Sequence, residues 1–191
     1  VSAISLVEFV MALFVSIFTA IATGGSVVAS QYLGNKQSGN AKITANQLVW
    51  FSFIFALFIA AVIIVLKDII LDYVFGDIGE QVRHDASHYL VFSAISAPFL
   101  AVYAAAAAIF RTMSNAKLPM YIMAAANLLN VLLTAISIYT FHTGILGIAI
   151  STLIAKVLAC FVIVYLLLDI RLKLHIRKSF IYKFDYEIIK K

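Results

Sequence analysis

The sequence predicts an all-α membrane protein, a polytopic bundle of five transmembrane helices in succession. Of its 191 residues, 64% are hydrophobic and 12% are charged, whereas a soluble domain has about 45–50% apolar and 25% charged residues. The apolar residues come in runs of about 20, the length that an α-helix needs to cross the hydrocarbon core of a bilayer. These two observations exclude a water-soluble fold and make the lipid bilayer the first partner of the chain.

The first two spans are separated by a short polar turn. The first span is predicted over residues 6–31, and the chain leaves it at Gly34-Asn35-Lys36, where glycine and asparagine suit a helix exit. The second span is predicted over residues 48–66. It begins near Trp50, an aromatic residue of the kind that prefers the membrane interface.

The remaining three spans follow a charged stretch. Residues 68–88 carry too many charged side chains for the bilayer core, so an aqueous loop is predicted there. The third span is predicted over residues 89–110 and contains Pro98. The fourth and fifth spans are predicted over residues 119–141 and 145–168.

Basic residues are distributed unequally between the two sides of this bundle. Eleven of the 14 Lys and Arg residues fall on the side of the first turn, the third connection and the tail, and two fall on the opposite side. The positive-inside rule therefore places the basic tail, residues 169–191, in the cytoplasm and Val1 outside an inner (plasma) membrane. The tail either lies along the anionic membrane surface or serves as a topology anchor and linker. Because half of the basic residues belong to this tail, the net charge does not indicate a nucleic-acid partner.

Several kinds of enzyme and metal site are disfavoured by the residues present. Cys160 is the single cysteine, so neither an intramolecular disulfide nor a cysteine-based metal site can form. His84 and His88 have zinc-protease spacing, but Asp85 stands where that motif needs Glu and a third ligand is not identified. We therefore predict no metal site, no cofactor and no enzymatic activity. The sequence also has no nucleotide-binding loop, so transport would draw on an ion gradient rather than on ATP.

Four motifs carry a resemblance to a known family. Two lie at cytoplasmic ends of predicted spans, at residues 24–34 (GGSVVASQYLG) and 111–120 (RTMSNAKLPM). Two more follow at Asn127-Leu128-Leu129-Asn130 and at residues 144–152 (GILGIAIST). In their order, spacing and sidedness they resemble the multidrug and toxic compound extrusion (MATE) family over essentially the whole chain.

The resemblance implies an architecture and a function. The resemblance implies two six-helix lobes related by a pseudo-twofold axis. It also implies that substrate and coupling ion bind in the lobe interiors and in the cleft between the lobes. The chain would then supply helices two to six of the first lobe, with the first helix and the second lobe as missing partners. The implied activity is Na⁺ or H⁺ antiport that exports amphipathic or cationic drugs and toxic compounds. The alternatives are a lipid-linked saccharide flippase of the same superfamily, and a non-transporting membrane scaffold or half-transporter.

Two positions depart from the family pattern. Ser114 stands where the family usually has glycine, and Thr134 stands where Asp or Asn is common. The second departure weakens the assignment of a cation ligand in the fourth span.

Polar residues inside the spans are the candidate site, because they are costly in lipid unless they have a role or a partner. Glu8 lies near the outer end of the first span, where the resemblance commonly shows an acidic residue. It is either a vestibule or cation-relay carboxylate, or a solvated interface acid or partner of a basic residue. Asn127 and Asn130 share one face of the fourth span. They either line a cavity on a cation or substrate path, where their carbonyls meet a cation or bound water, or join helices by hydrogen bonds. Lys156 lies near the middle of the fifth span. It has either a gating or substrate-repelling role or a structural one, paired with Glu8 or with the asparagines.

Three further residues are candidate helix hinges. Gly24 and Gly25 lie near the inner end of the first span, and Pro98 lies within the third. Such residues bend helices and would assist a rocking motion, although kinks also occur without function.

Overall fold

The computed structural model describes residues 2–75, 80–140, 144–168 and 174, and these residues form six α-helices. The helices are α1 (Ser2–Gly34), α2 (Ser38–Val65), α3 (Lys67–Phe75), α4 (Glu80–Thr112), α5 (Lys117–Tyr139) and α6 (Gly144–Leu167). All except the short α3 are long and apolar enough to cross a membrane. The predicted all-α bundle with five spans is therefore confirmed. The predicted basic tail lies outside the described residues apart from Leu174.

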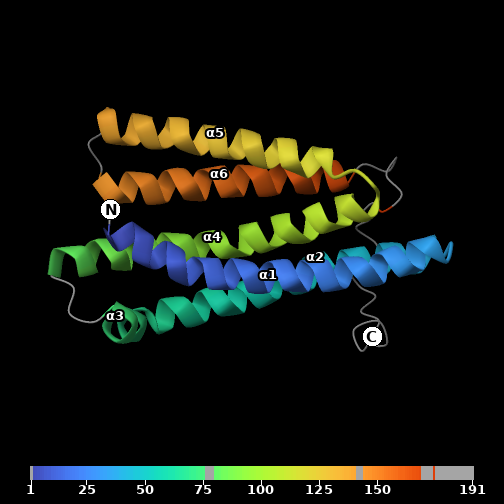
Figure 1. Cartoon of the computed structure of the whole chain (residues 1–191), viewed down its shortest axis with the longest axis horizontal. Coiled ribbons are helices and arrows are strands. Elements are labelled where there is room, and N and C mark those ends of the chain that lie inside the picture. Colours follow the sequence, from blue (N-terminus) through green and yellow to red (C-terminus); the bar gives the residue numbers. More distant parts are fainter. Residues whose placement is uncertain (1, 76–79, 141–143, 169–173, 175–191) are drawn as a thin grey trace.

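The five long helices lie roughly side by side, with α4 at the centre (Figure 1). α4 packs extensively against α1, α2 and α6 and also touches α3 and α5, whereas α5 packs chiefly on α6. The α1–α2 and α4–α5 turns lie at one end of the bundle, and α3, the end of α5 and the start of α6 lie at the other (Figure 1). The site described below therefore lies on the α6 side of α4.

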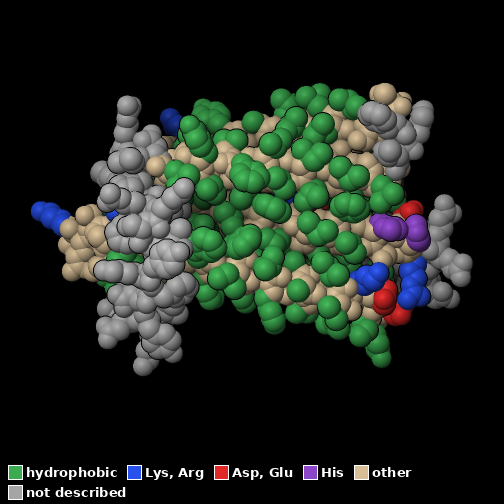
Figure 2. All heavy atoms as spheres, turned by 180° about the vertical axis from the view of Figure 1, so that it is seen from behind, with side chains coloured by type: hydrophobic (Ala, Val, Ile, Leu, Met, Phe, Trp, Pro, Cys, Tyr) green, Lys and Arg blue, Asp and Glu red, His purple; other side chains and the backbone are tan. Residues whose placement is uncertain are grey.

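Small side chains allow the helices to approach α4 closely. Ala94, Ala97, Ala101 and Ala105 are fully buried along its length, and alanine lets neighbouring helix backbones come into contact in a membrane. Large hydrophobic side chains lie on the outside instead and cover the middle of the molecular face seen in Figure 2, while charged and histidine side chains gather towards the ends. This distribution is the one expected of a protein whose solvent is lipid.

The helices extend beyond the predicted spans. α3 and the first two turns of α4 occupy the stretch that was predicted as an aqueous loop, so the prediction of a loop is wrong for these residues. Leu71 and Ala86 are buried in the same apolar cluster as Leu90, and Asp72 and Arg83 form a salt bridge of 2.8 Å between α3 and α4. The charged residues thus lie on the outward side of amphipathic helices whose other side is packed.

Two turns contain a non-glycine residue in the left-handed region. Lys36, not the glycine before it, has a φ of 59° in the α1–α2 turn, and Ser114 has a φ of 61° in the α4–α5 turn. Left-handed conformations favour glycine because it has no Cβ. The left-handed backbone at Ser114 therefore explains why the family pattern has glycine at this position.

The proposed hinge residues lie within continuous helices. α1 runs unbroken through Gly24 and Gly25, and α4 runs unbroken through the buried Pro98. A Cβ atom on Gly25 would collide with the side chain of Leu48 in α2, whereas a Cβ on Gly24 would meet no atom within 4 Å. Gly25 therefore allows close packing of α1 on α2, and the hinge roles stay predictions.

Candidate functional site

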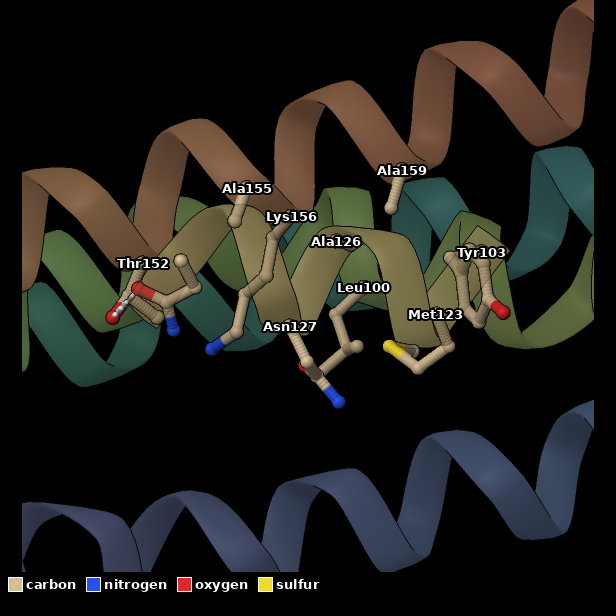
Figure 3. Close-up of a pocket in the computed structure, with 10 residues that line it drawn as sticks. Leu100, Tyr103, Met123, Ala126, Asn127, Thr152, Ala155, Lys156 and Ala159 are labelled. Carbon is tan, nitrogen blue, oxygen red and sulfur yellow. Dashed lines mark hydrogen bonds between the residues drawn. The ribbon is translucent and has the colours of Figure 1, made fainter. Parts of the chain in front are cut away.

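A pocket lies at mid-depth of the bundle between α4, α5 and α6 (Figure 3). About 70 Å³ of its volume is open to a water-sized molecule, which is room for a few waters at about 10–15 Å³ each. Ten residues line it: Leu100, Tyr103, Met123, Ala126, Asn127, Asn130, Thr152, Ala155, Lys156 and Ala159. Three of the four path residues predicted from the sequence are among them.

Helical spacing brings the polar lining residues onto facing surfaces. Asn127 and Asn130 are one turn apart on α5, and Thr152 and Lys156 are one turn apart on α6, so each pair lies on one face of its helix. The side chains of Asn127 and Lys156 project into the same space (Figure 3). The pocket thus joins polar groups that are more than twenty residues apart in the sequence.

Two hydroxyl groups fix the amide of Asn130. Its Oδ1 accepts a hydrogen bond from Thr134 Oγ1 at 3.3 Å and another from Thr152 Oγ1 at 3.5 Å. Thr134, which replaces the Asp or Asn of the family pattern, therefore orients an amide and brings no charge. Because the carbonyl oxygen of Asn130 is used, its NH₂ group remains to donate.

The ammonium group of Lys156 has a hydroxyl partner. Its Nζ donates to Ser96 Oγ of α4 at 3.4 Å, and Ser96 Oγ itself donates to the carbonyl oxygen of Ser93 at 2.7 Å. Ser96 is 1% exposed. Glu8 acts on Lys156 electrostatically, but Lys156 is in no salt bridge within the described ranges of the chain.

Glu8 lies outside the pocket and is held by a tyrosine. The hydroxyl group of Tyr89 on α4 donates a hydrogen bond of 2.6 Å to Glu8 Oε1. The side chains of Ser93 and Thr152 lie beside the same tyrosine hydroxyl. Glu8, Tyr89, Thr152 and Asn130 therefore form a polar series that leads from the N-terminal part of α1 to the pocket. Oxygen atoms in such a series can relay a proton or bind a hard cation.

A polar face of α1 lies apart from the pocket. Thr19 and Thr23 are exposed, and each hydroxyl donates to a backbone oxygen one turn earlier, at 2.8 Å. Ser16 and Ser30 lie on the same side, are exposed, and are satisfied in the same way. These side chains need no other protein partner, yet they give α1 a polar stripe along its exposed side.

Sequence reasoning missed the contribution of α4 to the site. Tyr89, Ser93 and Ser96 fall at positions i, i+4 and i+7 and so lie on one helical face. That spacing is the signal that identifies this face, although residue 89 enters the sequence prediction only as the start of a span. Thr152 was likewise noted only as part of a motif.

The histidine pair of α4 lies far from the pocket, at the end of the bundle. His84 Nε2 and His88 Nε2 are 3.2 Å apart. Within the ranges that the structure describes, no three His, Cys, Asp or Glu side chains gather to hold a metal ion.

Comparison with known proteins gives consistent matches. The family model described as MatE matches residues 1–136. The protein described as "Uncharacterized transporter YisQ" from Bacillus subtilis (strain 168) is 26% identical over 185 residues, which cover 94% of this chain and 40% of that protein. The chain therefore spans about two-fifths of the length of this relative.

Solved structures share the fold. An inward-facing conformation of a multidrug resistance MATE family transporter of the MOP superfamily aligns with a TM-score of 0.89 at 24% identity, over 98% of this chain and 42% of that one. An outward-facing conformation of such a transporter aligns with a TM-score of 0.89 at 22% identity, over 99% of this chain and 42% of that one. The helices described above thus have one arrangement that fits both conformations.

Proposed function

Because the chain belongs to the MatE family, whose members are membrane transporters, we propose that it forms part of a secondary transporter driven by a Na⁺ or H⁺ gradient. The transporter exports small amphipathic drugs and toxic compounds, cationic ones among them, across the inner membrane. The outer end of the bundle carries α3, the end of α5 and the start of α6, and the α1–α2 turn faces the cytoplasm. The remainder of the protein, which includes one further helix and a second lobe, supplies the opposite wall of the cleft.

The observation that carries this proposal is the polar pocket at mid-depth. Asn127, Asn130, Thr152 and Lys156 come from two membrane helices and line one cavity. Burial of such groups within hydrocarbon is costly, and their convergence is typical of a solute or ion path. A bundle that only served as a scaffold would have no need to gather them around open volume.

The coupling ion acts at Glu8. This carboxylate is the acidic group of the polar series, and Tyr89 connects it to the side chains beside the pocket. Protonation of Glu8, or binding of Na⁺ to its oxygen atoms, changes the charge felt by Lys156, because the two side chains interact electrostatically. Ion binding and solute binding are coupled in this way through groups of the same lobe.

Movement of the lobe as a unit accounts for alternating access. The same helix arrangement aligns equally well with inward-facing and outward-facing transporters. Repeat-built transporters commonly expose a midplane site by rocking one bundle against the other. We therefore assign the change of access to motion between lobes rather than to repacking of α1 to α6.

Transport in proteoliposomes tests the proposal. The complete gene product is reconstituted, a Na⁺ or pH gradient is imposed, and movement of ethidium, an amphipathic cation, is followed by fluorescence. We expect gradient-dependent movement that Glu8→Gln abolishes, while Asp68→Asn, a change of an exposed acid on α3, leaves it intact. Ethidium movement that is independent of both gradients would contradict ion coupling. Unchanged gradient dependence in Glu8→Gln would exclude a relay role for Glu8.

A second candidate function is favoured by the charge of the pocket. Lys156 suits the pyrophosphate of a lipid-linked saccharide, so the flippase alternative remains a proposal beside drug export. Translocation of a fluorescent lipid-linked saccharide by the reconstituted protein, with no movement of ethidium, would favour the flippase.

A further inference from the structure

We propose that the pocket between α4, α5 and α6 is a subsite for an acidic group, a carboxylate or a phosphate, with Lys156 as its cationic partner. The inference rests on the proposed transport function and names the charge of the substrate group that enters this pocket. Cationic groups of a substrate would bind elsewhere.

The charge of the lining is the first argument. Lys156 is the one charged side chain among the ten residues that line the pocket. Its hydrogen-bond partner, Ser96, is neutral, and the salt bridges in the described residues involve Asp72 and Arg83 or His84 and Asp85. A cation placed at mid-depth of a membrane protein needs a compensating anion. Glu8 acts on Lys156 only electrostatically, without a salt bridge among the described residues, so a bound acid would supply the anion in direct contact.

The direction of the hydrogen bonds is the second argument. The ammonium group of Lys156 has three protons, and Ser96 accepts one of them. The carbonyl oxygen of Asn130 is already engaged by Thr134 and Thr152, so its NH₂ group is left to donate. The pocket therefore offers more donors than acceptors. Carboxylate and phosphate oxygens, which only accept, match this surplus.

The rest of the lining indicates an amphipathic substrate. Leu100, Met123, Ala126, Ala155 and Ala159 are apolar, and the hydroxyl group of Tyr103 is used because it donates to the carbonyl oxygen of Pro119 at 2.6 Å. About 70 Å³ of open volume admits a head group rather than a whole drug-sized molecule. An acidic head group of the substrate thus binds beside Lys156, while its apolar part packs against the apolar lining residues.

Binding of three dansyl probes that differ in charge tests this inference. The complete gene product is placed in phosphatidylcholine nanodiscs, and the affinities of dansylglycine (acidic), dansylglycinamide (neutral) and dansylcadaverine (cationic) are measured by fluorescence anisotropy. We expect dansylglycine to bind about tenfold tighter than the other two, because a hydrogen bond to a charged group is worth about one such factor or more.

Two variants and one control localise the effect. Lys156→Met is expected to lower the affinity for dansylglycine about tenfold and to leave that for dansylglycinamide within about twofold, whereas Lys156→Arg keeps the preference. Lys67→Met, which removes a positive charge on α3, is expected to change neither affinity. If Lys156→Met does not fold, wild type and Lys156→Arg still test the inference, because both must bind dansylglycine more tightly than the other two probes.

Several results would overturn the inference. Tighter binding of dansylcadaverine than of dansylglycine is one, and an equal loss of both dansylglycine and dansylglycinamide binding in Lys156→Met is another. Repetition in phosphatidylglycerol nanodiscs identifies the source of the acid: if dansylglycine is displaced, the subsite holds a lipid head group, and if it is not, the subsite holds a free solute. Transport that ignores ion gradients would refute the proposed function while leaving the preference for the acid intact.

Discussion

α4 and α5 are neighbours in the sequence and both span the membrane, but they differ in what covers them. In the most apolar window of α4, 67% of the residues are buried inside the protein, against 6% for α5. α4 lies at the centre of the bundle, whereas α5 packs chiefly on α6 (Figure 1). The polar residues of α4 therefore act by holding other side chains in place. On α5, Asn127 and Asn130 line the pocket instead.

Overpacking gives the largest expected difference between the two helices. Ala105→Phe in α4 places a large side chain at a site with no exposed surface and should cost about 3 kcal/mol of stability. The matched change Ala124→Phe lies on the exposed side of α5 and should cost less than about 0.5 kcal/mol. Thermal unfolding followed by size-exclusion chromatography in detergent measures both. Equal losses would contradict the central position of α4.

Removal of the tyrosine hydroxyl from α4 should have the next largest effect. Tyr89→Phe deletes the 2.6 Å hydrogen bond to Glu8, and a hydrogen bond to a charged group is worth about 1.5–3 kcal/mol. We expect ion-driven transport to fall at least about tenfold while the affinity for dansylglycine is unchanged. Thr44→Val, which removes a buried hydroxyl bonded within α2 and away from the pocket, is the control for a general loss of packing. Intact ion coupling in Tyr89→Phe would exclude the polar series as the coupling route.

The two asparagines of α5 should separate stability from ligand binding. Asn130→Ala loses the bonds from Thr134 and Thr152 and should destabilise by about 1 kcal/mol. Asn127 is exposed, so Asn127→Ala should leave stability unchanged and weaken binding of the acidic probe by about threefold. Loss of stability in Asn127→Ala with no change in binding would show that α5 uses this residue for packing.

The turn that joins the two helices gives the smallest expected effect. Ser114 has a φ of 61°, and a left-handed conformation costs a non-glycine residue about 1–2 kcal/mol, of which the greater flexibility of glycine in the unfolded chain offsets about half. Ser114→Gly should therefore stabilise the protein by about 0.5–1 kcal/mol without altering transport. Lower stability of this variant in thermal unfolding would show that the turn is not strained.

The sequence was sufficient for the parts of the molecule that depend on local pattern. Apolar runs predicted the five spans, and the cost of polar groups in lipid singled out Asn127, Asn130 and Lys156, all of which line the pocket. The helices at residues 67–75 and 80–88 were missed, because their charged residues resemble a loop when the buried partners are unknown.

Hydrogen bonds between distant residues of the site also could not be predicted from the sequence. Tyr89 and Glu8 are 81 residues apart, and Lys156 and Ser96 are 60 residues apart. Helical periodicity identifies which residues share a face of one helix. It does not identify which face of a neighbouring helix packs against them. These partners therefore depended on the packing of α4 against α1 and α6.

Cysteine accessibility along α5 tests the central claim, that its polar side faces a wet pocket, most directly. Cys160 and any cysteine in the rest of the protein are replaced by alanine, and Asn127→Cys or Leu128→Cys is introduced into the complete gene product in membranes. Both positions are exposed on the described chain, so burial by this chain cannot distinguish them. The account predicts rapid labelling of Asn127→Cys by a membrane-impermeant methanethiosulfonate and none of Leu128→Cys. Labelling of Leu128→Cys with an unreactive Asn127→Cys would place the asparagine in lipid and contradict the account.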